Sequence, residues 1–80
     1  MENFKEKPRY YLGKRYGYEA SKVIEDFNLG YNLGNAVTYL LRAGKKVYVN
    51  DSSRASMIAD IEKTINHLNF ELDKLYNEKD

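Results

Sequence analysis

Six polar side chains, spaced by three or four residues within two stretches of the chain, have the types that bind a phosphorylated ligand. They are Asn35, Tyr39 and Arg42 in the first stretch and Asp60, Lys63 and His67 in the second. Side chains at this spacing lie on one face of a helix, so each stretch predicts a polar stripe. Arginine holds phosphate through a bidentate fork and lysine does so as a point charge. We expect a ligand pocket where the two stripes face each other.

Roles within this pocket follow from side-chain chemistry. Asn35 and Asp60 have the groups to contact a base or ribose edge, and Tyr39 has a ring that stacks and a hydroxyl that hydrogen-bonds. His67 has the chemistry to bind the ligand or to transfer a proton near neutral pH. The alternative is that the second stripe is a solvated face with charge pairs three residues apart, each worth a few tenths of a kcal/mol.

A basic and aromatic segment, residues 9–18, interleaves tyrosines with lysine and arginine and contains two glycines. Its Lys14, Arg15 and Tyr16 offer two cations and a ring, which suit a phosphate and a stacked base. We expect this segment to be an ordered loop that completes the pocket in its own subunit or a neighbouring one. Lys45, beyond the first stripe, is a further predicted phosphate contact. The alternative is that the tyrosines cover a small core while the cations are solvated.

Other chemistries lack the residues that they need. The chain has no cysteine and one histidine, His67, which excludes a thiol nucleophile and a multi-histidine metal site within one chain. Neither the phosphate-loop pattern nor the dinucleotide-binding glycine fingerprint occurs. Glu25 and Asp26 are adjacent, so on a helix they diverge by about 100°. The serines of segment 51–56 fit helix caps. We predict no catalytic residue, no metal and no cofactor.

The first polar stripe belongs to a predicted helix within residues 32–46. Its apolar face is formed by five residues at helical spacing, namely Leu33, Ala36, Val37, Leu40 and Leu41. Asn32 is the predicted N-cap and a further ligand contact, and Gly44 stands where the helix is expected to stop in the left-handed conformation.

Two further helices are predicted over residues 19–28 and 53–76. The shorter has an apolar stripe of Ala20, Val23, Ile24 and Phe27. The longer has a seam with alternating steps of three and four, namely Ile58, Ile61, Ile65, Leu68, Leu72 and Leu75. We expect this heptad-like seam to pack against the first two helices and to reach a second subunit.

Length and composition bound the fold. The sequence predicts a single all-α domain, residues 1–80, with three main helices, a long C-terminal helix and a loosely held segment 1–8. A domain of this size buries only about 60% of its unfolded surface, and the chain has no disulfide, so we expect a homo-oligomer. The net charge of +1 does not favour generic nucleic-acid binding, and no apolar run approaches the roughly 20 residues that span a bilayer. We therefore expect a cytoplasmic protein.

The motifs resemble a family of small phage proteins known as a domain of unknown function. The residues that carry the resemblance are Tyr16, Gly17, Glu19, Asn32, Gly34, Asn35, Ala36, Tyr39, Arg42, Ala43, Gly44, Lys45, Asp60, Lys63 and His67. The same pattern is similar to the C-terminal part of a phage nucleotide kinase that acts on deoxynucleoside monophosphates. The resemblance implies a helical, oligomeric, nucleotide-binding phage protein in the host cytoplasm.

Three functions follow as hypotheses. The first is that the protein binds and sequesters a phosphorylated nucleotide without turnover, as phage sponge proteins do with the cyclic or ADP-ribose-type signals of host defence; this is an analogy of protein type. The second is a deoxynucleoside monophosphate kinase. The third is helix-turn-helix DNA binding, which is disfavoured because the cations follow the second helix, whereas recognition helices read bases near their N-terminus.

Overall fold

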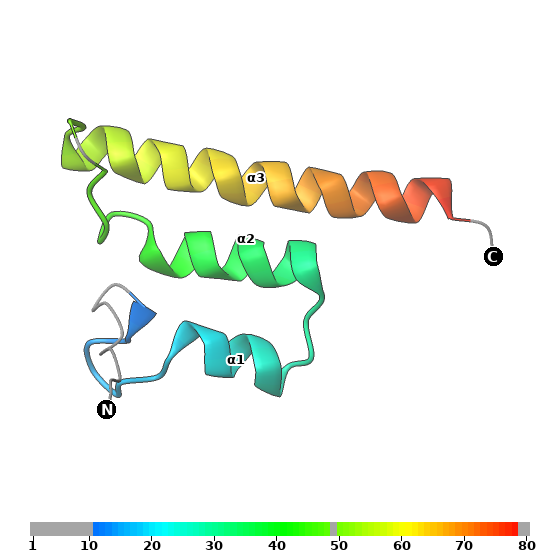
Figure 1. The fold of residues 1–80 in the computed structure, drawn as a ribbon, viewed down its shortest axis with the longest axis horizontal. Coiled ribbons are helices and arrows are strands. Elements are labelled where there is room, and N and C mark those ends of the chain that lie inside the picture. The colour runs from blue at the N-terminus through cyan, green and yellow to red at the C-terminus, as the bar shows by residue number, and fades with distance from the viewer. Residues whose placement is uncertain (1–10, 49, 79–80) are drawn as a thin grey trace, which may run out of the picture.

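The computed structural model describes residues 11–48 and 50–78, which form three α-helices: α1 (Ala20–Asp26), α2 (Tyr31–Arg42) and α3 (Ser53–Asn77) (Figure 1). Within this part of the chain the only β pairing is an isolated bridge between Leu12 and Glu19. The predicted all-α class with a long C-terminal helix is confirmed. The prediction for segment 1–8 lies outside the described residues.

Helix α1 is shorter than predicted, because Glu19 is its N-cap and Phe27 its C-cap. Asn28 follows with a φ of 56°, a left-handed conformation that stops the helix and turns the chain toward α2. Two residues later, Gly30 is the N-cap of α2. Asn32 is therefore not the N-cap, as the sequence predicted, but lies inside the first turn, where its side chain is directed at α3.

The end of α2 and the start of α3 agree with the sequence prediction. Gly44 has a φ of 82°, the left-handed conformation that glycine adopts without penalty, just after the C-cap Ala43. The Ser52 side chain accepts a hydrogen bond of 3.0 Å from the Ala55 N–H and so caps α3. The loop between them contains Tyr48, which hydrogen-bonds to Arg42 of α2 and to Ser56 of α3.

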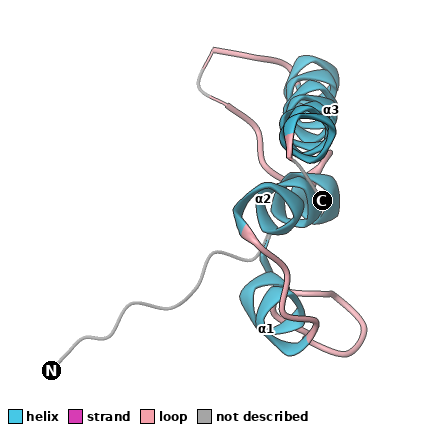
Figure 2. Cartoon of the chain, turned by 90° about the vertical axis from the view of Figure 1, so that its right-hand side faces the viewer, coloured by secondary structure: helices cyan, strands magenta, loops and turns pink. Residues whose placement is uncertain are grey.

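The three helices form one layer. In the view along the helices, α2 lies in the middle, with α1 on one side and α3 on the other (Figure 2). Close packing of α1 on α2 depends on Gly34, because a Cβ there would approach Ile24 Cγ2 to 3.0 Å. Helix α3 is longer than α2 and continues past it at its C-terminal end (Figure 1).

The prediction that the seam of α3 packs against the first two helices is wrong. Its six side chains are 40–53% exposed, whereas the buried residues of α3 are Ser56, Asp60 and Thr64. Steps of about 100° per residue place the seam roughly 110° around the helix from the edge that meets α2. Among the described residues, only Ala20 and Ala36 are buried apolar side chains. The α2–α3 contact is therefore mainly polar.

Candidate functional site

The centre of the α2–α3 contact is an ion pair between two buried side chains. Arg42, in the last turn of α2, is 6% exposed, and Asp60, in the second turn of α3, is 0% exposed. Arg42 Nη2 lies 3.5 Å from Asp60 Oδ1. Because a charge in a low-dielectric interior needs a partner, each residue makes the burial of the other tolerable. The two polar stripes therefore meet, as the sequence predicted.

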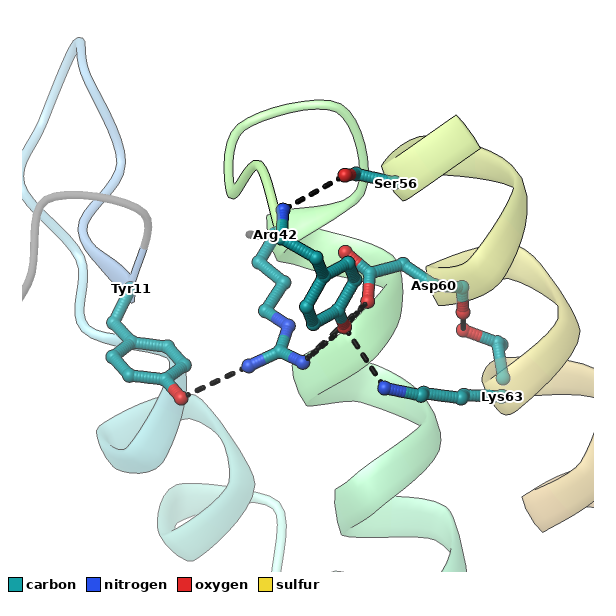
Figure 3. A network of polar contacts seen from close by, with 7 residues as sticks. Tyr11, Arg42, Ser56, Asp60 and Lys63 are labelled. Carbon is teal, nitrogen blue, oxygen red and sulfur yellow. Dashed lines mark hydrogen bonds and ion pairs between the residues drawn. The ribbon is translucent and has the colours of Figure 1, made fainter. Parts of the chain in front are cut away.

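The hydroxyl of Tyr48 joins three charged side chains. Arg42 Nη2 donates to it at 2.7 Å and Lys63 Nζ at 3.0 Å, while the hydroxyl donates to Asp60 Oδ1. The Tyr48 backbone N–H donates to Ser56 Oγ at 2.8 Å, which fixes the loop against α3. These hydrogen bonds make one network in which α2, the 43–52 loop and α3 converge (Figure 3).

Further aromatic groups surround the Arg42 guanidinium. Tyr11 accepts a hydrogen bond of 3.2 Å from Nη1, approaching from the N-terminal side of the site (Figure 3). The Tyr39 ring lies 4.6 Å from Arg42 Cζ and 5.3 Å from Lys63 Nζ. Both cations thus lie within the range at which an aromatic ring attracts positive charge.

The electrostatics of the cluster keep both cations charged. Burial lowers the pKa of Arg42, but its hydrogen bond to Tyr48 and the attraction of Asp60 outweigh that effect and leave the pKa raised. The hydrogen bond to Tyr48 likewise raises the pKa of Lys63. Two cations therefore face one carboxylate. Within the described structure, Asp60 Oδ2 is buried without a hydrogen-bond partner, so an acceptor is available in the cluster.

A second group of side chains extends from the cluster along the α2–α3 contact. The His67 ring stacks on Tyr39, with centroids 5.7 Å apart and planes inclined by 14°. His67 Nδ1 lies 3.2 Å from Asn32 Oδ1, and Asn32 Nδ2 donates to Glu71 at 3.4 Å. Tyr31 contacts the His67 ring edge-on, with centroids 5.9 Å apart. The site is consequently a row of rings and polar groups that begins at the two cations.

The structure assembles six of the eleven predicted ligand contacts at the α2–α3 boundary. They are Asn32, Tyr39, Arg42, Asp60, Lys63 and His67. Asn35 instead donates to the Tyr31 carbonyl of its own helix at 2.8 Å. The other four, which are exposed, have no hydrogen bond or ion pair to the cluster among the described residues. These are Lys14, Arg15, Tyr16 and Lys45.

Two tyrosines of the cluster are not among the site residues that the sequence predicted. Tyr48 lies in a segment predicted only as a loop, and Tyr11 lies in segment 9–18 but was not singled out. No periodicity marks a loop residue, so spacing alone held no signal for Tyr48. Its position between two lysines and the serines of the α3 cap was the one local indication, since a phenol beside cations is a hydrogen-bond partner for them.

A shallow hollow lies along α1, but its lining includes the carboxylates of Glu19, Glu25 and Asp26 with one lysine, Lys22, so it repels anions.

The described residues contain no group of three or more histidine, cysteine, aspartate or glutamate side chains that could hold a metal ion. In the same part of the chain, no helix has both the length and the apolar character that crossing a membrane requires.

Comparison of the chain with protein-family models, with curated proteins and with solved structures gives no match.

Proposed function

We propose that this protein binds a phosphorylated nucleotide between α2 and α3 and holds it without turnover. The observation that carries the proposal is the pair of cations, Arg42 and Lys63, set against a single carboxylate, Asp60, at one end of an aromatic row. An excess of positive charge next to stacked rings matches a ligand that has a phosphate at one end and a base at the other.

Lys63 is the phosphate contact that a ligand reaches first, because it is only partly buried whereas Arg42 is almost enclosed. Both donate to the Tyr48 hydroxyl. A phosphate oxygen beside Arg42 and Lys63 would accept hydrogen bonds from the same two cations, strengthened by charge, if the Tyr48 hydroxyl moves aside but stays between the phosphate and Asp60. Ligand entry therefore requires Tyr48 and its loop to shift, which is a local movement of residues outside the helices.

The aromatic row supplies the other half of the site. The parallel rings of Tyr39 and His67 offer a face on which a base stacks, and Asn32 provides an amide beside them. Asp60 Oδ2 is the acceptor for an amino or hydroxyl group of the ligand. A ligand that donates a hydrogen bond to this buried oxygen would bind more tightly than one that cannot. The reason is that an unsatisfied buried acceptor costs free energy.

Holding the ligand, rather than transferring a phosphoryl group, is favoured by the distribution of charge. A kinase needs donor and acceptor sites side by side with charge stabilisation between them. In the described structure the paired cations form one cluster, and Lys14 and Arg15 lie exposed on a turn without contacts to it. Together with the resemblance to small phage proteins, this favours sequestration of a nucleotide signal, of which host defence signals are the expected class.

The test is incubation of the pure protein with mono-, di- and cyclic nucleotides, followed by mass spectrometry of the filtrate and of the heat-released fraction. We expect one nucleotide to disappear from the filtrate and to return intact on heating. Lys63→Met should weaken its affinity at least about tenfold, because one charge-assisted contact is worth about 1.5–3 kcal/mol. Lys22→Met is the matched control, since Lys22 is an exposed lysine of α1 that pairs with the exposed Glu25.

The other outcomes of this experiment are equally definite. A nucleotide recovered with a phosphate gained or lost would establish turnover and replace sequestration by the kinase hypothesis. Equal affinity of wild type and Lys63→Met would contradict the site assignment, provided that circular dichroism shows both variants folded. Retention of no nucleotide by wild type would contradict the proposed function.

A further inference from the structure

We infer that the exposed apolar face of this helical layer is the interface with a second copy of the chain, and that the two α3 helices pair antiparallel across it. The face contains the seam of α3, which is Ile58, Ile61, Ile65, Leu68, Leu72 and Leu75. This inference goes beyond nucleotide binding and does not depend on it.

The seam has the spacing of a coiled coil but lacks a partner helix in the described structure. Its steps alternate strictly between three and four over residues 58–75 of α3, and its side chains are 40–53% exposed. A 3.5-residue repeat matches a facing helix with the same repeat. The edge of α3 that meets α2 is a different one, occupied by Ser56, Asp60 and Thr64.

Helix α2 contributes to the same side of the layer. Steps of 100° place Leu33 and Leu40 about 120° from the stripe that faces α3, and the seam of α3 is rotated by a similar angle from the stripe that faces α2. Because the two helices run antiparallel (Figure 1), these rotations bring both apolar sets to one face. Leu33 is 37% and Leu40 58% exposed. The apolar surface therefore spans two helices.

The described part of the chain encloses little apolar core. Its only buried apolar side chains in the described part are Ala20 and Ala36. Single-chain domains of this size are already marginal, and without disulfides or metals they gain the missing burial by association. Exposed contiguous apolar surface beyond a few hundred Å² is rare in monomers and marks an interface. Among the described residues, the seam places six exposed large apolar side chains on one face of a single helix.

The sequence before the described region is a poor cover for this surface. Segment 1–10 has only three large apolar residues, Met1, Phe4 and Tyr10, among ten. Six seam positions and the leucines of α2 exceed what these could bury. A second α3 brings six matching side chains over residues 58–75, one for each seam position. At 1.5 Å per residue, its seam has the same length as the seam that it covers, about 25 Å.

Charge at the two ends of α3 selects the antiparallel orientation. Near its N-terminus, Lys45 and Arg54 are exposed together with Asp51, so this end is net positive. Near its C-terminus, Asp73 and Glu78 are exposed together with Lys74, so that end is net negative. Antiparallel pairing brings the basic end of each copy to the acidic end of the other, and parallel pairing brings like charges together. A two-fold axis near the middle of the seam sets Ile58 opposite Leu75 of the second copy.

Site-directed disulfides test this orientation, because the native chain has no cysteine. Ile58→Cys and Leu75→Cys are prepared separately, then mixed under oxidising conditions. We expect the mixed pair to cross-link and each variant alone to remain largely uncross-linked, since identical positions lie about 25 Å apart along an antiparallel pair. Cross-linking of each variant with itself, or no cross-linking in the mixture, would overturn the proposal.

Sedimentation of the reduced protein tests the surface independently. We expect wild type to be dimeric or a multiple of dimers, and Ile65→Lys to raise the dissociation constant at least about tenfold, because a charge at the seam centre is buried without a partner. Asn66→Lys, the same charge on the neighbouring exposed position, should change it less than about threefold. A monomeric wild type at high concentration, or equal effects of the two lysines, would contradict the interface. Nucleotide retention is measured separately, so failure here leaves the ligand site standing.

Discussion

At the scale of single residues, the defining feature is a buried ion pair that holds α2 to α3. Arg42 and Asp60 are both nearly inaccessible and share the Tyr48 hydroxyl as a common partner. Such a pair contributes little net stability, but removal of one member leaves a buried charge unpaired. We expect its consequence to be specificity, because Arg42 and Asp60 pair only in the register that the two helices adopt.

A double-mutant cycle measures this coupling. Asp60→Leu alone should lower the free energy of unfolding by about 3–5 kcal/mol, because Arg42 keeps its charge in a buried position. Adding Arg42→Met should restore much of this loss, since neither charge then remains. Urea unfolding followed by circular dichroism provides both values. Equal losses in the single and double variants would show that the two charges are not coupled.

The raised pKa of Lys63 predicts a dependence of stability on alkaline pH. Folding favours the protonated amine, so its contribution is fully present below the ordinary pKa of 10.5 and is lost as pH rises through the higher folded value. Unfolding free energies of wild type and Lys63→Met, compared from pH 8 upward, should therefore converge above about pH 10.5. A constant difference across this range would contradict the interaction between Lys63 and Tyr48.

At the scale of elements, the helices are set by local signals rather than by a common core. Gly44 ends the α2 segment with a φ of 82°, and Ser52 begins α3 with a side-chain hydrogen bond. The loop between them is fixed by the bond from the Tyr48 N–H to Ser56 Oγ. The position of Tyr48 in the site therefore depends on where α3 starts.

Removal of the α3 cap should affect both stability and the site. Ser52→Ala deletes the acceptor for the Ala55 N–H and should lower the free energy of unfolding by about 1 kcal/mol. Ser53→Ala is the matched control, because Ser53 lies within the helix and is exposed, and it should change stability by less than about 0.5 kcal/mol. Chemical denaturation checks both; similar losses would mean that Ser52 does not act as the cap.

At the scale of the whole molecule, the fold is a single layer with polar contacts inside it and an apolar face outside it. A layer of three helices cannot enclose a core, because α2 alone has neighbours on both sides (Figure 2). The apolar side chains that the sequence places on α3 therefore remain available for association. The proposed ligand site and the proposed association surface occupy different edges of the same helix, so one chain could use both.

The sequence by itself determined the helices and the composition of the polar stripes. Helical spacing, Gly44 and the serines before α3 were sufficient to predict three helices, with α3 correct to one residue at its C-terminal end. Spacing also placed Asp60, Lys63 and His67 on one edge, and this edge does meet the stripe of Tyr39 and Arg42. These features depend on neighbours in sequence, which a periodic pattern records.

Only the tertiary structure decided which edge of α3 meets α2 and which loop residues enter the site. Periodicity tells which side chains share a face but not which face finds which neighbour, so the apolar seam was assigned to the core although the polar edge packs there. Asn32 was assigned to a cap, whereas a helix starting at Tyr31 directs it to Glu71. Tyr48 reaches Arg42 through a loop, and the path of a loop is fixed by contacts that no local pattern encodes.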